Sequence, residues 1–290
     1  MNSVLDLTEF CPMYCARPRN GTVSALFLLA ALTVALLLAS CARFPSGPIE
    51  GDNHPHPGVN RARSLPIQGV DISRYQGEVD FARLRAAGTH FVFIKATEGA
   101  DYVDPAFARN WAGARAAGLA RAAYHFMWWC SSAEDQAKWF EANVPADPDA
   151  LPPILDVEWN NHSQFCARRP SPDEAFRMVS TMLTLMERYT GKLPIIYTDI
   201  AFHRDVLAGR DLPNTFWLRS VAAEPDARYA ARDFTFWQWT QTGTMPGISG
   251  EVDRNAFYGS PDEWTLFLLT GCDPRMLPIL GPGGRCLSMK

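Results

Sequence analysis

The stretch PPILDVEW, residues 152–159, is a short apolar run that ends in two carboxylic acids, Asp156 and Glu158. Its near-continuous apolar character predicts a strand with both faces covered, as in the parallel sheets of α/β proteins. Two unpaired acids inside a core would be costly, so we expect the strand to open into a cleft. Side chains at positions i and i+2 of a strand point to the same face, so Asp156 and Glu158 would flank one bond.

Similar apolar runs occur before and after this stretch, and amphipathic segments alternate with them. Strands are predicted at 67–73, 90–96, 120–128, 152–159 and 193–198, and helices at 79–88, 105–118, 132–144 and 171–191. Later strands are predicted at 215–221, 234–241 and 250–257, with little helix between them. The pattern indicates an α/β fold, a TIM-like barrel of eight strands in which five βα units precede three strands.

Acidic residues fall at the predicted strand ends, where the active sites of such barrels lie. Asp71 ends the first strand, Asp156 and Glu158 end the fourth, and Asp253 ends the last. The first and last strands of a closed barrel are neighbours, so Asp71 and Asp253 are expected to lie close together. Glycoside hydrolysis needs a protonated carboxylic acid beside the leaving oxygen, and crowded acids in apolar surroundings provide one. Glu158, the outermost acid, is the predicted general acid.

The N-terminal part of the chain is predicted to direct export. Residues 23–41 are almost entirely apolar and end in Leu-Ala-Ser-Cys, which resembles a bacterial lipobox with Cys41 as the lipidated residue. We therefore expect a signal peptide over 1–41 and a membrane-anchored lipoprotein facing the periplasm or cell exterior, with a single-pass signal anchor as the alternative. The Pro- and Gly-rich residues 42–66 are predicted to be a linker, 67–269 the barrel and 270–290 a C-terminal extension.

The cysteine count and the net charge bear on disulfide formation and on the class of binding partner. An even number of cysteines after the export signal suggests disulfides, and Cys130–Cys166 and Cys272–Cys286 are the expected pairs. Other pairings and free thiols stay open from the sequence. The net charge of −4, without a long basic run, gives no indication of nucleic-acid binding. We expect a monomer.

Aromatic residues near the predicted strand ends suit a sugar cleft, because apolar sugar faces pack on aromatic rings. Core filling is the competing interpretation, and the sequence does not separate the two. The residues are Tyr75, Trp128, Trp129, Trp159, Tyr197, Trp217, Trp237 and Trp239.

Six segments taken together resemble glycoside hydrolase family 25, the lysozymes that cleave peptidoglycan. They are GVDISRYQGEVDF, FVFIKATEG, AAYHF, LPPILDVEW, KLPIIYT and FWQWTQTGTMPGISGEVDRNAF, and they span about residues 67–260. The resemblance implies an eight-stranded barrel and hydrolysis of the β-1,4 bond between N-acetylmuramic acid and N-acetylglucosamine, without a metal or organic cofactor. It implies that Glu158 is the general acid, that Asp156 assists it, and that Asp71 and Asp253 belong to the site.

The sequence also departs from the family pattern. Relatives commonly have W-x-A-x-Y where this chain has Trp217-Leu218-Arg219-Ser220-Val221, so Arg219 is new at the predicted mouth. We expect Arg219 to pair with a substrate carboxylate, such as one of a peptide stem, or with an active-site Asp. Lys95, Tyr75, Tyr197, Trp217 and Trp237 are the other predicted substrate-binding residues.

Two functions fit these residues. The first is an active, lipid-anchored muramidase acting on peptidoglycan glycan strands, in which the substrate's own acetamido group attacks and Asp156 orients it. The second is a non-catalytic peptidoglycan-binding lipoprotein built on the same barrel.

Overall fold

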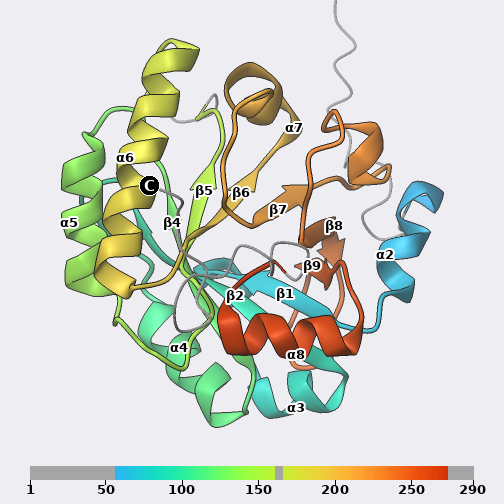
Figure 1. Cartoon of the computed structure of the whole chain (residues 1–290). Helices are drawn as coiled ribbons and strands as arrows, with labels where there is room; N and C mark the ends of the chain where they lie inside the picture. Colours follow the sequence, from blue (N-terminus) through green and yellow to red (C-terminus); the bar gives the residue numbers. More distant parts are fainter. Residues whose placement is uncertain (1–55, 161–165, 274–290) are drawn as a thin grey trace, which may run out of the picture. The chain divides into compact units, whose positions relative to one another are not determined.

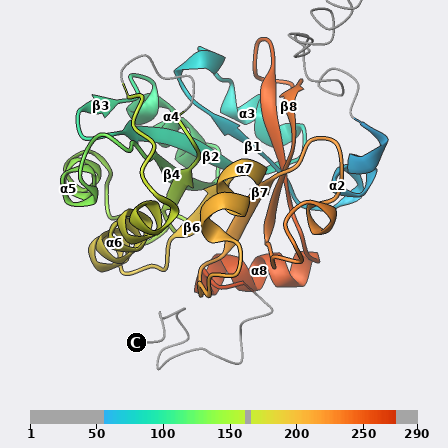
Figure 2. The same ribbon diagram turned by 90° about the horizontal axis from the view of Figure 1, so that it is seen from above.

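The computed structural model describes residues 56–160 and 166–273. Within them, strands form one sheet in the order β1-β9-β8-β7-β6-β5-β4-β2-β3, and β1 also pairs with β2. The additional pairing closes eight strands into a barrel (Figure 1). Strand β3 pairs only with β2 and lies outside the barrel (Figure 2). The predicted α/β barrel of eight strands is therefore confirmed.

The elements follow the expected order of five βα units and then three strands. The barrel strands are β1 Gln68–Ile72, β2 Thr89–Glu98, β4 Ala120–Phe126, β5 Ile154–Val157, β6 Ile195–Thr198, β7 Phe216–Arg219, β8 Phe236–Gly243 and β9 Val252–Phe257, with β3 at Tyr102–Val103. The helices are α2 Asn60–Ser64, α3 Phe81–Ala86, α4 Phe107–Ala116, α5 Ala133–Asn143, α6 Pro172–Thr190, α7 Ile200–Phe202 and α8 Pro261–Thr270. Single turns occur at η1 Pro57–Val59, η2 Arg74–Gln76, η3 His203–Leu207 and η4 Pro225–Ala227.

The last strand reverses the direction of the sheet. Strand β9 is antiparallel to both of its neighbours, β8 and β1, whereas the other barrel strands run parallel to one another. Asp253 is the second residue of β9 and not its end, so that detail of the prediction is wrong. Because β9 is reversed, its beginning lies at the same barrel end as the carboxyl ends of the parallel strands. We call this end of the barrel the mouth.

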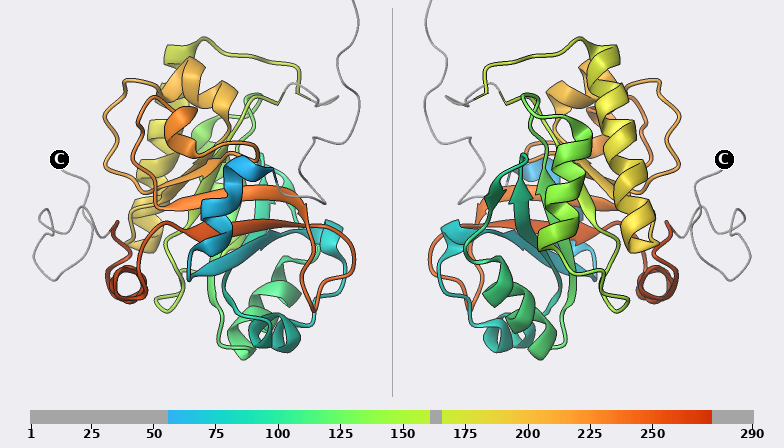
Figure 3. Two further views of the ribbon diagram at one scale, coloured as in Figure 1. Left: turned by 90° about the vertical axis from the view of Figure 1, so that its right-hand side faces the viewer. Right: turned by 90° about the vertical axis from the view of Figure 1, so that its left-hand side faces the viewer.

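Two hydrophobic cores hold the barrel together. One fills its interior with large aromatic side chains, including Phe91, Phe93 and Phe236. The other lies between the strands and the surrounding helices, of which α5 and α6 pack side by side (Figure 3). Helix α8 closes the end opposite the mouth, where Trp264 and Phe267 join the interior core (Figure 2).

Helix boundaries follow local sequence signals. Helix α6 begins after Ser171, whose hydroxyl accepts the Glu174 N–H at 3.3 Å, and ends at Gly191 in the left-handed conformation with φ 69°. Helix α8 has a capping box formed by Ser260 and Glu263. The sequence predicted α6 with its caps but not α8.

The folded part begins earlier than predicted. Residues 42–66 were expected to be a linker, yet η1 and α2 lie within this range, and Val59 and Ala62 are fully buried. The Gln68 side chain donates to the carbonyls of Ala62 and Leu65, both at 2.8 Å, and so joins α2 to the start of β1. The Pro- and Gly-rich composition concealed a short helix that covers the side of the barrel.

The described residues contain no helix with the length and apolar character needed to cross a bilayer. The predicted signal peptide and the lipidation residue Cys41 lie outside the described residues, as does Cys286, the predicted partner of Cys272.

Candidate active site

The predicted acids converge on the mouth of the barrel. Asp71 and Asp253 face each other in register on β1 and β9, and Asp156 is the third residue of β5, two positions before Glu158. Asp156 interacts electrostatically with both Glu158 and Asp71. The fold therefore brings together acids that are almost 200 residues apart in the sequence, and Tyr124 of β4 lies among them, within reach of the charges of Asp71, Asp156 and Asp253.

Amide side chains hold Asp71 and Asp253 in place. The Gln238 amide nitrogen donates to Asp71 Oδ2 at 3.0 Å and to Asp253 Oδ2 at 3.2 Å. Asn255 donates to Asp71 Oδ2 at 2.8 Å. Burial raises the pKa of Asp71, and the bonds from Asn255 and Gln238 act in the opposite direction because they favour the ionised form. These two acids are thus fixed members of a network.

Tyr197 and Trp217 form the floor under this network. The Tyr197 hydroxyl donates to Gln238 Oε1 at 2.9 Å, and the Trp217 indole N–H donates to Asn255 Oδ1 at 2.8 Å. Their rings lie 4.3 Å apart between centroids, and Trp217 is only 2% exposed. We predicted that both residues bind substrate, but in this structure they support the residues above them because they are buried in the interior core.

Trp237 was also predicted to bind substrate, and this assignment is wrong. It is 0% exposed and belongs to the core between barrel and helices, with its indole N–H bonded to the Ser220 carbonyl at 2.7 Å. Adjacent residues of a strand point to opposite faces, so Trp237 must face outward if Gln238 faces inward.

The surroundings of Glu158 raise the pKa of its carboxyl group. Burial raises its pKa from the ordinary 4.5 to about 7, the negative charge of Asp199 adds to the increase, and the positive charge of Arg219 opposes it. The pKa of Asp156 is raised well above its usual range by burial and then by the charge of Glu158. Asp156 Oδ1 is buried and has no hydrogen-bond partner among the described residues. Two carboxyl groups in this arrangement share a proton near neutral pH.

A groove lies beside the mouth, next to the ends of β1 and β2. It has a volume of 320 Å³ and its lining includes Tyr75, Lys95, Tyr102 and Trp128. Tyr75 is 76% exposed, and Lys95 forms an ion pair with Glu98 at 2.5 Å. Three larger cavities, of 550, 500 and 380 Å³, lie elsewhere, and none of these cavities nor the groove itself is lined by the four predicted acids.

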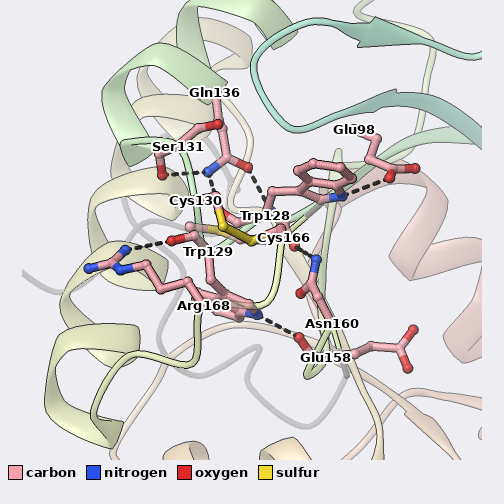
Figure 4. Close-up of a disulfide and its surroundings, with 11 residues drawn as sticks. Glu98, Trp128, Trp129, Cys130, Ser131, Gln136, Glu158, Asn160, Cys166 and Arg168 are labelled. Carbon is pink, nitrogen blue, oxygen red and sulfur yellow. Dashed lines mark hydrogen bonds between the residues drawn. A yellow bond between two sulfur atoms is a disulfide. The ribbon is translucent and has the colours of Figure 1, made fainter. Parts of the chain in front are cut away.

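The backbone of Glu158 is anchored from the neighbouring strand end. The Trp129 indole N–H donates to the Glu158 carbonyl at 2.8 Å (Figure 4). The Trp129 ring also stacks on Phe202. A disulfide joins Cys130 to Cys166, as predicted, and links the segments that follow β4 and β5. Glu158 therefore sits on a stretch of chain that is tied to its neighbour on both sides.

The sequence did not single out several residues of the site. Gln238 and Asn255 lie inside one of the segments that carry the family resemblance, and Asp199 directly follows the predicted strand 193–198. Strand alternation was the available signal, since Asn255 is two positions after Asp253. The described part of the chain contains no group of three or more side chains suited to hold a metal ion.

Comparison with known proteins identifies the family. The profile of glycosyl hydrolases family 25 matches residues 70–248. The chain belongs to glycosyl hydrolase family 25. It is therefore a glycoside hydrolase, and the barrel with acids at its mouth is the arrangement expected of family 25.

Individual relatives agree with this assignment. The uncharacterized protein YegX of Escherichia coli K12 is 37% identical over 211 residues, which are 71% of this chain and 74% of YegX. Lysozyme M1 of Streptomyces globisporus is 31% identical over 283 residues, covering 86% of this chain and 96% of that lysozyme. The structure of a family 25 glycosyl hydrolase from Bacillus anthracis superposes with a TM-score of 0.66 at 33% identity, covering 75% of this chain and 98% of that one.

Proposed function

We propose that this protein is a muramidase that hydrolyses the β-1,4 bond between N-acetylmuramic acid and N-acetylglucosamine in peptidoglycan, with Glu158 as its general acid. The observation that carries the proposal is the pKa of Glu158, raised to about 7 in a barrel mouth that also holds Asp156. The similarity to Lysozyme M1 supports a peptidoglycan substrate.

In the proposed mechanism, Glu158 donates its proton to the glycosidic oxygen as the bond to the anomeric carbon breaks. The acetamido oxygen of the same sugar attacks that carbon and forms an oxazolinium ion. The remaining acids favour this route over attack by a carboxylate, because Asp71 and Asp253 already accept hydrogen bonds from Gln238. Glu158 then takes a proton from water, whose oxygen adds to the anomeric carbon as the bond from that carbon to the acetamido oxygen breaks. The acetamido group is restored, and the configuration of the anomeric carbon is retained.

Asp156 has a defined part in this scheme. Its buried Oδ1 lacks a protein partner and would accept the N–H of the acetamido group. That bond favours the ionised form of Asp156 and leaves the shared proton on Glu158, where the first step needs it.

The test is analysis of new reducing ends after digestion of purified peptidoglycan. Ends that are N-acetylmuramic acid support the proposal, and ends that are N-acetylglucosamine contradict it. Glu158→Gln should lower turnover by about 10²- to 10⁴-fold while it still binds glycan strands. Glu251→Gln, which removes an exposed acid next to β9, is the matched control. The alternative, a non-catalytic binding protein, requires that the wild-type protein binds glycan strands and generates no new ends.

We also propose that the protein is exported and anchored by lipid at Cys41, with a single-pass signal anchor as the alternative. Metabolic labelling with a fatty acid would distinguish them, since Cys41→Ser should remove the label only if Cys41 is the lipidated residue.

A further inference from the structure

Arg219 brings a positive charge into the ring of acids. It is the last residue of β7, two positions after Trp217, and therefore belongs to the same inward face of that strand. It pairs in register with Gln238, which binds Asp71 and Asp253. Its side chain is half-buried, so it remains accessible from the mouth.

The guanidinium interacts with the charges of Glu158 and Asp199 but forms few hydrogen bonds. One terminal nitrogen donates to the Gln241 side chain, which is neutral. Its Nε is buried and has no partner within the described residues. None of the ion pairs formed by those residues includes Arg219, so the expected salt bridge with an active-site Asp is not formed.

Lys95, the cation on the opposite side of the mouth, is in a different situation. Its ammonium group is neutralised by Glu98 at 2.5 Å. An incompletely paired charge in a half-buried position is unfavourable, and a bidentate acid is the ligand that a guanidinium fork binds best. The mouth thus combines acids on β1, β5 and β9 with a cation on β7 that feels the charges of Glu158 and Asp199 but forms no ion pair with either of them.

We propose that Arg219 binds a carboxylate carried by the muramic acid residue of the substrate. This inference rests on the proposed muramidase function and specifies the glycan that the enzyme prefers. N-acetylglucosamine has no ionisable group, whereas muramic acid carries a lactyl ether. The lactyl carboxyl is free in peptide-free glycan and amide-linked in peptide-bearing glycan, where the next carboxylates belong to the stem peptide.

The test compares the kinetics of wild type and Arg219→Ala on two forms of one substrate. The first is peptide-free peptidoglycan glycan with free lactyl carboxylates, and the second is the same glycan after conversion of those groups to methylamides. The measured quantity is the ratio of kcat/KM on the free acid to kcat/KM on the methylamide. We expect Arg219→Ala to lower this ratio about tenfold, mainly through KM, as the loss of a charge-assisted hydrogen bond predicts.

The ratio also separates carboxylate binding by Arg219 from other effects of the Arg219 charge. Arg219 acts on the pKa of Glu158, and a change there alters turnover of both glycans equally and cancels. Arg219→Gln, which keeps a hydrogen-bonding side chain beside Gln241 without the charge, should lower the ratio to the same extent if Arg219→Ala does not fold. An unchanged ratio in the folded variants rules out the lactyl carboxylate, and the proposal is overturned if glycan that bears stem peptides also shows no loss of kcat/KM specific to Arg219→Ala.

A third substrate identifies the source of the carboxylate. Glycan that bears stem peptides has no free lactyl group, so a loss of kcat/KM specific to Arg219→Ala on this glycan assigns the carboxylate to the peptide. A loss confined to the peptide-free acid assigns it to the lactyl group. If wild type cleaves none of the glycans, the proposed function fails. The ratio of the Kd for the free acid to the Kd for the methylamide, measured by calorimetry for wild type and Arg219→Ala, still decides whether Arg219 recognises the carboxylate.

Discussion

The charge of Asp199 should determine the pH at which the enzyme loses activity. Asp199 follows β6 directly, and its Oδ1 accepts the N–H of Phe202 at 2.7 Å as the cap of α7. It is the neighbouring charge with the largest effect on the pKa of Glu158. Asp199→Asn removes the charge and keeps an oxygen for the cap, so it perturbs the electrostatics of the mouth with little effect on the fold.

The size of the effect follows from the fraction of Glu158 that is protonated. With a pKa of about 7, about half of the Glu158 side chains carry a proton at pH 7, compared with roughly 0.3% for a glutamate at the ordinary 4.5. A negative neighbour raises the pKa of an acid, so its removal must lower that pKa. A decrease of about one unit leaves roughly one tenth of the enzyme in the active form at pH 7.

The assay is kcat/KM on soluble peptidoglycan between pH 4 and 9. Wild type should lose activity above about pH 7, and Asp199→Asn should lose it at a lower pH with a similar maximum. Asp226→Asn, an exposed acid on η4, controls for the loss of one negative charge. An alkaline limit that stays unchanged or moves to higher pH in Asp199→Asn refutes the assignment of Glu158 as the acid controlled by Asp199.

Three further predictions concern stability. Asn255→Leu removes a donor from buried Asp71 and should lower the free energy of unfolding by about 1–3 kcal/mol in a denaturant titration; an unchanged midpoint would show that the amide network is not stabilising. Replacing both Cys130 and Cys166 by serine releases a loop with a sequence separation of 36 and should cost about 2–4 kcal/mol, measured against wild type with and without reductant. His125 has its pKa lowered by burial from 6.5 to about 4, so its contribution to stability is complete above pH 6.5 and is lost as the pH falls toward 4, by about 3 kcal/mol. In denaturant titrations between pH 4 and 7, His125→Gln should reduce the change of the free energy of unfolding with pH. A change as steep as that of wild type would contradict the assignment of this pH dependence to His125.

Much of the fold was predictable from the sequence because periodicity and caps are local. The apolar run before Asp156 predicted a buried strand, and Ser171 and Gly191 marked the ends of α6. The reversal of β9 was not predictable in this way, since strand direction depends on how the chain returns to its neighbours. Helix α8 was missed although Ser260 and Glu263 give it a capping box.

The sequence predicted the acids of the candidate site but not the amide side chains of Gln238 and Asn255 that hydrogen-bond to them. The acids stand out because charges at the ends of apolar strands are unusual. The aromatic residues were assigned with less success, since a tryptophan suits a core and a sugar cleft equally well by composition. Alternation along β8 distinguishes them, because Gln238 faces Asp71 and its neighbour Trp237 faces the helices.

The reversed final strand also determines where the protein can be extended. Because β9 runs away from the mouth, the chain leaves the barrel at its closed end and passes through α8 to Asp273. The Asp273 carboxylate accepts a hydrogen bond at 2.5 Å from the hydroxyl of Thr235, the residue just before β8. A fluorescent domain or affinity tag joined after this point would emerge on the side remote from the glycan. Such fusions should leave a bulky, insoluble polymer free to reach the acids.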